Sequence, residues 1–354
     1  AQDMNEYIKT RIPHLSNDLR DFIIKTVGGN LYYLNTFIDI LTKNKELIGI
    51  PKSLDKFITL NFKNLNTIDM EILQIIAVFG KSIEFELILE YLKDKCDTHE
   101  LVRSLQNLVA NSILERKNET YFFQNPIYQK MIYFNINPNE KSKIHEKIAT
   151  ALQIKYTVDD CNYSYIAEHL LFSGNAEKAL PFLLQSASLY MQKMYYDSAR
   201  NYYLKALDIL EDNQKIDVFV ELANIEFFFG NFEKQIFYLS KFIIVKSDND
   251  KKATALMNMG TAYIKLGSFI KAIEYLELGY KLTNKENRVK FLIKLAQCQN
   301  LLGHYQFALD ILNNPEKDLA RLKTLDSDYI YELAISYYYK MEYLSAQNLL
   351  KSAV

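Results

Sequence analysis

The second half of the chain repeats one pattern with a period of 36 to 38 residues. A small residue is followed seven positions later by a turn residue, and five positions after that by a second small position. The first small residues are Ala187, Ala223, Gly260, Ala296 and Ala334. The turn positions are Met194, Gly230, Gly267, Gly303 and Met341, and the second small positions are Ala199, Gln235, Ala272, Ala308 and Ala346. Internal repeats of this length are typical of solenoid proteins.

Each repeat is predicted to be a pair of helices joined by a tight turn. Small residues let two helix backbones approach closely, and three of the five turn positions are Gly, which such a turn prefers. A single pair cannot bury its apolar face alone, so neighbouring pairs stack into a superhelix with a concave surface. An earlier pair, 163–172 and 176–192 around Gly174, is predicted to lead into the array.

These residues resemble the tetratricopeptide repeat. The segment Gly260-Thr-Ala-Tyr263-x-x-x-Gly267-x-x-x-x-Ala272 matches the small, aromatic, Gly and Ala positions of that family. The Trp of the repeat is missing, since the chain has no Trp, and the period exceeds the usual ~34 residues. The resemblance implies an α-solenoid that binds a protein or peptide and seldom performs chemistry.

The sequence of the first half predicts two further structural segments. Residues 1–63 are predicted to form short helices at 18–27, 31–43 and from Pro51 onward. Residues 64–156 are predicted to form helices at 67–79, about 84–92 and 98–110, then strands at 113–116 and 121–123, then helices opened by Asn125-Pro126 and Asn137-Pro138. Three helices followed by a β-hairpin are typical of a winged helix. The predicted fold is therefore all-α, with a helical lid-like segment (1–63), a winged helix carrying a small β-hairpin (64–156) and a tetratricopeptide-like array (157–354).

In order along the chain, these segments resemble the middle of a signal-transduction ATPase of the STAND class. Thr26-Val-Gly28-Gly29-Asn30-Leu31 looks like the motif that closes the helical lid of that class. Ile50-Pro51 and the following segment from Leu65 to Leu73 look like its link into the winged helix. The resemblance implies a helical lid and winged helix that relay signals, with a nucleotide-binding domain before residue 1. The chain begins at Ala1 and not at Met, so we expect it to be a piece of a longer protein.

The phosphate-binding loop of that class is absent from this sequence. Gly80-Lys81-Ser82 looks similar, but Ile75 stands where the loop needs another Gly, and a helix is predicted directly before Gly80. The family often has a nucleotide-sensing His where this chain has Asn125, which is explained as a helix cap. We therefore expect no cofactor in this chain, with ATP or ADP bound only if an upstream domain exists.

Composition limits the remaining function classes. The net charge is -1, from 42 basic and 43 acidic side chains, which argues against nucleic-acid and anionic-membrane binders. No apolar run reaches the length of a membrane helix, and three scattered Cys indicate a reducing, cytoplasmic setting. The winged helix leaves DNA binding open as an alternative, but its 98–110 helix offers only His99 and Arg103, and its wing only Arg116 and Lys117.

Catalytic and metal-binding groups do not cluster in the sequence. The five His residues are isolated from one another, and His145-Glu146 lacks the second His of a zinc-protease helix. His169 lies among apolar neighbours, as a packed, hydrogen-bonded His does. We therefore expect neither an enzyme nor a metal protein.

The predicted site is the groove formed by the first helix of each repeat. Its aromatic and amide side chains suit a peptide, since rings supply contact area and amides pair with the peptide backbone. Asn224, Asn258, Lys290 and Lys294 also match positions with which some repeat proteins clamp a carboxylate, although Val220 replaces a further Lys. The predicted groove residues are Asn224, Phe227, Phe228, Asn258, Thr261, Ile264, Lys265, Lys290, Lys294, Gln297, Asn300, Leu301, Ile335, Tyr338 and Tyr339.

The sequence favours a regulatory or sensor module that binds a protein or peptide and relays this to a domain outside the chain. A stand-alone scaffold or adaptor and a DNA-binding transcription regulator are the alternatives. Oligomers formed through the full-length protein also stay open.

Overall fold

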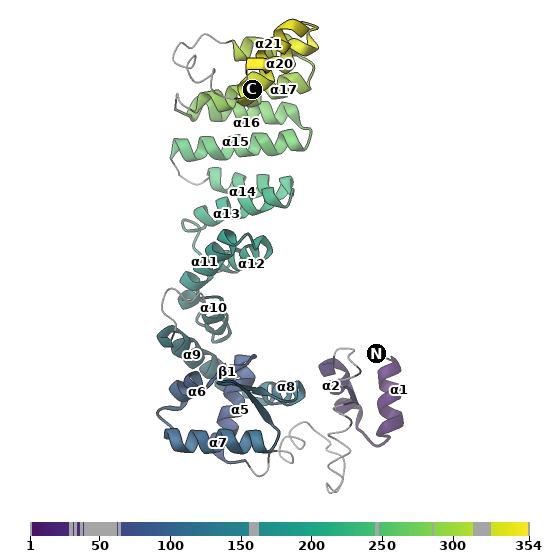
Figure 1. The fold of residues 1–354 in the computed structure, drawn as a ribbon, viewed down its shortest axis with the longest axis vertical. Coiled ribbons are helices and arrows are strands. Elements are labelled where there is room, and N and C mark those ends of the chain that lie inside the picture. Colours follow the sequence, from purple (N-terminus) through teal and green to yellow (C-terminus); the bar gives the residue numbers. More distant parts are fainter. Residues whose placement is uncertain are drawn as a thin grey trace. The chain divides into compact units, whose positions relative to one another are not determined.

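The computed structural model describes residues 2–27, 31, 34, 35, 38, 62, 65–155, 163–244, 248–284, 287–313 and 327–352. The chain divides into two compact units, Ala1–Ser186 and Ala187–Val354. Helices dominate both units, as predicted (Figure 1).

The chain begins with two helices, α1 (Gln2–Arg11) and α2 (Asn17–Val27), which pack against each other. Arg20 is buried, and its guanidinium donates through Nε and Nη2 to the carbonyl oxygen of Leu15 at 3.1 and 2.5 Å. This contact fixes the bend that leads into α2. Most of the predicted helix at 31–43, almost all of the predicted helix from Pro51 and most of the lid-like motif at 26–31 lie outside the described residues.

Helix α5 (Thr67–Phe79) has the predicted bounds and clear signals at both ends. The side chain of Asn66 accepts from the Asp69 amide at 2.7 Å, and the Asp69 carboxylate accepts from the Asn66 amide at 3.1 Å. Gly80 ends the helix in a left-handed conformation with φ of 83°. Gly80-Lys81-Ser82 therefore follows a helix C-terminus, whereas a phosphate-binding loop precedes a helix N-terminus.

The next elements follow the order expected for a winged helix. After α5 come β1 (Ile83–Glu84), α6 (Phe85–Leu92), α7 (Thr98–Ala110), β2 (Leu114–Lys117) and β3 (Thr120–Phe123). The strands form an antiparallel sheet in the order β1-β3-β2, in which Tyr121 faces both Ile83 and Arg116. The hairpin turn has two residues, Asn118 and Glu119, whereas the predicted turn had four residues. Strand β1 was not predicted, and α6 begins one residue later than expected.

Three helices follow the sheet: α8 (Pro126–Asn135), α9 (Pro138–Lys155) and α10 (Tyr163–Phe172). Helix α9 packs against α5, α6 and α10. Where α9 meets α10, His145 and His169 are both buried. Helix α11 (Ala176–Gln192) follows α10 after the turn at Gly174, and both helices have the predicted bounds.

The second unit is a succession of helix pairs, and Figure 1 shows α15 and α16 lying side by side as one such pair. Each helix packs against the next along the chain, and first helices also contact one another, as α17 does with α15 and α20. The first helices are α13 (Lys215–Phe228), α15 (Asn249–Lys265), α17 (Arg288–Leu301) and α20 (Ser327–Tyr339). The second helices are α12 (Tyr196–Leu207), α14 (Phe232–Ile244), α16 (Phe269–Leu282), α18 (Tyr305–Leu312) and α21 (Tyr343–Ser352).

The predicted turn positions share one backbone geometry. Gly230, Gly267 and Gly303 have positive φ, and Met194 and Met341 adopt the same conformation with φ of 59° and 66°. At Gly267, the Ser268 amide donates to the Tyr263 carbonyl at 2.9 Å, and the Gly267 amide donates to the Ile264 carbonyl at 3.0 Å. Equivalent hydrogen bonds occur at Gly174 and at the other four turns. Each hairpin therefore closes with a Schellman-type motif, even where Met replaces Gly.

The small positions are buried in every repeat, as the pattern predicted. At Gly260, an added Cβ would lie 2.6 Å from the Leu276 Cγ. The side chain of Leu276 therefore packs directly against the backbone of the first helix of this pair. A further close approach occurs at Gly279, where an added Cβ would lie 2.4 Å from the Phe291 Cε1 of the following repeat. Gln235 is the one large residue at a small position, and it too is buried.

Candidate functional site on the first helices of the array

Four first helices present the same stripe of positions to solvent. The stripe takes residues i, i+4, i+7 and i+11, which lie on one helix face. In each helix the outer two positions are exposed and the middle two are half-buried, except that Glu332 is buried. The stripes are Asp217, Glu221, Asn224 and Phe228 on α13; Thr254, Asn258, Thr261 and Lys265 on α15; Lys290, Lys294, Gln297 and Leu301 on α17; and Asp328, Glu332, Ile335 and Tyr339 on α20.

The turn end of each stripe is apolar or aromatic in three of the four helices. Phe228 stacks on Tyr196 of the preceding repeat, with ring centroids 4.6 Å apart and planes inclined by 14°. Tyr339 stacks in the equivalent way on Tyr305, at 4.9 Å and 10°. The rings remain exposed, at 57% for Phe228 and 54% for Tyr339. We call these stacked pairs, with the neighbouring Phe227 and Tyr338, the aromatic rim.

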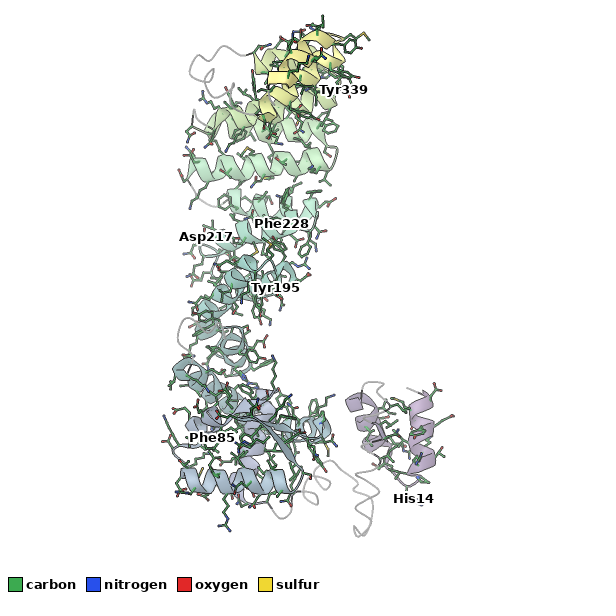
Figure 2. The ribbon with its side chains drawn as sticks, in the orientation of Figure 1. His14, Phe85, Tyr195, Asp217, Phe228 and Tyr339 are labelled. Carbon is green, nitrogen blue, oxygen red and sulfur yellow. The ribbon has the colours of Figure 1, made fainter. Side chains whose placement is uncertain are left out.

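The opposite end of the stripe carries charge on α13, α17 and α20, whereas on α15 it is Thr254. Figure 2 shows Asp217 and Phe228 at opposite ends of α13. On α13 the charged residues are Asp217 and Glu221, whereas on α17 they are Lys290 and Lys294. Sequence reasoning identified both Lys residues but missed the two acidic ones. The signal was available, because these residues occupy the repeat positions of Lys290 and Lys294.

Asn300 departs from the predicted groove, because its side chain is buried between α17 and α20. Its Nδ2 donates to the Glu332 Oε2 at 3.2 Å, and its Oδ1 accepts from the Ser336 hydroxyl at 2.9 Å. Burial raises the pKa of Glu332, while the hydrogen bond from Asn300 and the charge of Lys294 act in the opposite direction. This amide therefore joins two repeats and is not available to a ligand.

The predicted carboxylate clamp is not an open cluster of cations. The Lys294 Nζ donates to the Gln297 Oε1 at 3.3 Å, and its charge also acts on Glu332. Asn224 and Asn258 are half-buried on the neighbouring first helices, and Lys290 is exposed. The clamp stays a prediction, with a carboxylate of the protein already close to Lys294.

The remaining predicted groove residues vary in exposure. Phe227, Lys265, Leu301 and Tyr338 are exposed, whereas Thr261, Ile264, Gln297 and Ile335 are half-buried. The Thr261 hydroxyl donates to the Met257 carbonyl of its own helix at 2.9 Å. Apart from Asn300, every predicted residue therefore reaches the surface at least in part.

The segment predicted to be a winged helix offers few cations to a nucleic acid. His99 and Arg103 are exposed on α7, as are Arg116 and Lys117 on the wing. The Arg116 Nε donates to the Asn118 carbonyl within the hairpin at 2.9 Å. Part of this small set is therefore engaged within the hairpin itself.

Groups suited to chemistry are scarce in the part of the chain that the structure describes. Across the described residues, no cluster of three or more His, Cys, Asp or Glu could hold a metal ion. Cys298 is buried, and burial raises the pKa of its thiol to about 12, far from the range of a reactive thiolate. None of the helices described is both long and apolar enough to cross a bilayer.

The helix pairs can now be compared with known families. The model described as "Tetratricopeptide repeat" matches residues 172–213 and 253–286. The chain contains tetratricopeptide repeats. The matched segments cover the helix pairs α11–α12 and α15–α16. No curated protein matches the sequence.

Several solved structures are similar to the tetratricopeptide array or to the longer chain. MamA is 18% identical over 49% of this chain and 89% of its own, with a TM-score of 0.41. YrrB, described as a TPR protein with an unusual peptide-binding site, is 18% identical over 49% of this chain and 83% of its own, with a TM-score of 0.39. A STAND protein with a tetratricopeptide repeat sensor from Pyrococcus horikoshii is 16% identical, with a TM-score of 0.38. That alignment covers 99% of this chain and 59% of the Pyrococcus protein.

Proposed function

We propose that the tetratricopeptide array binds an extended segment of a partner protein along the stripes of α13, α15, α17 and α20. The supporting observation is the repetition of one exposure pattern on these four helices, with exposed stacked rings at the turn end. Exposed aromatic groups that gather on one surface are typical of interaction sites.

The stripes carry the groups that a peptide needs. Ring faces of the aromatic rim supply contact area at little cost in side-chain entropy. The half-buried amides of Asn224, Asn258 and Gln297 offer donors and acceptors to a peptide backbone. Binding in this groove requires no change in the helix pairs, whose cores are already filled.

The proposed role of the chain is regulatory. Binding in the array would be relayed through the winged helix and the lid-like segment to a nucleotide-binding or effector domain outside this chain. The support is the order of the sequence motifs and the winged-helix order of elements from α5 to β3. A free-standing scaffold would use the same groove without the relay.

Peptide selection on the full chain tests the binding proposal. Peptides from a random library are selected on the immobilised chain, and their affinities are measured for Phe228→Ala and Tyr339→Ala. We expect each variant to lose about tenfold in affinity, as truncation of an aromatic anchor commonly causes. Phe237→Ala and Phe307→Ala are matched controls, because these rings on second helices are 53% and 65% exposed. Equal losses in all four variants would contradict the groove.

The reading frame on either side of the chain tests the relay. A Gly-x-x-x-x-Gly-Lys-Ser/Thr loop encoded upstream would support a signalling ATPase. An initiator codon directly before Ala1 would contradict the relay and leave the scaffold.

A further inference from the structure

Two of the stripes carry a pair of like charges at the end opposite the turn. On α13, Asp217 and Glu221 are four residues apart, and on α17 so are Lys290 and Lys294. Like charges at this spacing destabilise a helix by a few tenths of a kcal/mol. The two like charges of each pair therefore repel each other within their helix.

The fold does not compensate these charges with ion pairs. Among the described residues, no ion pair involves Asp217, Glu221, Lys290 or Lys294. Nearby charges behave differently, since Lys215 pairs with Asp212 at 2.9 Å at the start of the same helix. Asp217, Glu221 and Lys290 are thus left available to a ligand, whereas Lys294 donates to Gln297 and its charge also acts on Glu332.

The signs differ between stripes. The stripe of α13 carries two carboxylates, that of α17 carries two ammonium groups, and on α15, between them in the sequence of first helices, Thr254 and Asn258 take the corresponding positions. On α20 the carboxylate of Glu332 is not exposed to a ligand, because it is buried against Asn300. A segment that crosses α13, α15 and α17 in turn therefore meets a negative, then a neutral, then a positive surface, and on α20 the exposed charged residue is Asp328.

We propose that the groove selects a partner segment with basic residues in one block and acidic residues in another, separated by an uncharged spacer. The basic block faces Asp217 and Glu221, and the acidic block faces Lys290 and Lys294. This inference rests on the proposed function, because it describes what the peptide groove recognises. Charge complementarity of this kind fixes the register of a bound segment more than it raises affinity.

Synthetic peptides test the proposal directly. The probes are fluorescent peptides with three Lys, an uncharged spacer of Gly, Ser and one Phe, and three Asp, made in both block orders. The comparison peptide has the same composition with Lys and Asp alternating. We expect one block order to bind the full chain about tenfold more tightly than the alternating peptide at low salt, and the difference to shrink at high salt. Equal binding of all three peptides would overturn the proposal.

Charge reversal in the protein locates the two blocks. Asp217→Lys with Glu221→Lys should remove the preference for the better block order, and Lys290→Glu with Lys294→Glu should do the same. The matched control is Glu233→Lys with Glu277→Lys, which makes the same change at exposed positions of the second helices α14 and α16. A control that lowers binding as much as the groove variants would also overturn the proposal.

The outcomes separate this inference from the proposed function. If library-selected peptides depend on Phe228 and Tyr339 but show no block preference, the groove stands and the charge rule fails. If they depend on neither ring, the proposed function fails as well.

Discussion

The imidazole rings of His145 and His169 share one hydrogen bond, with their Nδ1 atoms 2.8 Å apart in the buried contact between α9 and α10. One Nδ1–H donates to the other ring, so the accepting ring must be neutral, and burial disfavours a charge on the donating ring as well. Phe79 stacks on His169 and Phe172 lies against His145, which keeps water away from the pair. The His145 Nε2 has no hydrogen-bond partner within the described part of the chain.

This pair predicts acid sensitivity of the first unit. Burial and the charge of Lys141 lower the pKa of His145 to about 4, and burial and His145 lower the pKa of His169 to about 3. An unfolded His titrates near pH 6.5. The unfolded chain therefore binds more protons below pH 6.5, and the stabilising contribution is complete above that pH and lost as the pH falls towards 4 and 3.

Replacement by Asn tests this prediction. His169→Asn keeps a short hydrogen-bonding side chain and removes one titrating ring. We expect the slope of the unfolding free energy between pH 6.5 and 4 to fall by up to about 1.4 kcal/mol per pH unit. Urea unfolding followed by circular dichroism at several pH values measures it. His99→Asn, at an exposed position of α7, is the matched control.

The two Met turns predict a gain in stability. Met194 and Met341 hold a left-handed conformation that costs a non-Gly residue roughly 1–2 kcal/mol, and both side chains are largely exposed. Met194→Gly and Met341→Gly should each raise the unfolding free energy by about 0.5–1 kcal/mol, after the entropy cost of Gly. Gly267→Ala is the reciprocal variant, because its Cβ would meet nothing within 4 Å and only the backbone would be strained. A stabilising Gly267→Ala would contradict this account.

The contact at Gly279 predicts a loss of stability. A Cβ there would lie 2.4 Å from the Phe291 Cε1 and 3.2 Å from the Leu256 Cβ, within a filled core. Gly279→Ala should therefore lower the unfolding free energy by about 1–3 kcal/mol, as overpacking does. Adding Phe291→Leu should recover part of the loss, because ring atoms of Phe291 are the nearest contacts of the added Cβ. Lys281→Ala, exposed on the same helix, should change stability by less than about 0.5 kcal/mol.

The buried contact between Asn300 and Glu332 predicts that a second carboxylate at this contact lowers stability. Asn300→Asp would place a second carboxylate against Glu332 and should cost roughly 2–4 kcal/mol near pH 7. Glu332→Gln in the same chain should restore most of this loss, because it removes one of the two charges. A Glu332→Gln change that restores nothing would show that repulsion is not the cause. Chemical unfolding of the single and double variants forms the required cycle.

Much of the fold could be predicted because its signals are local. Asn66 begins α5 by side-chain capping, and Gly80 ends it in a left-handed turn. Both features can be predicted from adjacent residues. The repeat turns could be predicted from Gly230, Gly267 and Gly303 for the same reason. The Met turns were identified only by alignment with these Gly residues, because nothing in a Met side chain favours positive φ.

Features that depend on distant residues could not be predicted. Strand β1 has two residues and exists because Ile83 pairs with Tyr121, far along the chain. The burial of His169 was expected, but its contact with His145 was not, since a single sequence gives no distance between helices. The same limit applied to Asn300, whose partner Glu332 belongs to the next repeat. The groove was predicted from periodicity, whereas its charge pattern required the exposure of each position.

The shared turn geometry has a consequence for how such a chain can change through recombination. Each of the described hairpins closes with a left-handed residue, Gly or Met, and the same two hydrogen bonds, so Gly230 and Gly267 mark equivalent points on the backbone. A genetic exchange that joins one of these points to the other would add or delete a whole helix pair while the chain direction at the junction stays correct. The length of the groove, and with it the number of stripes a ligand meets, can thus be altered in single steps of one pair.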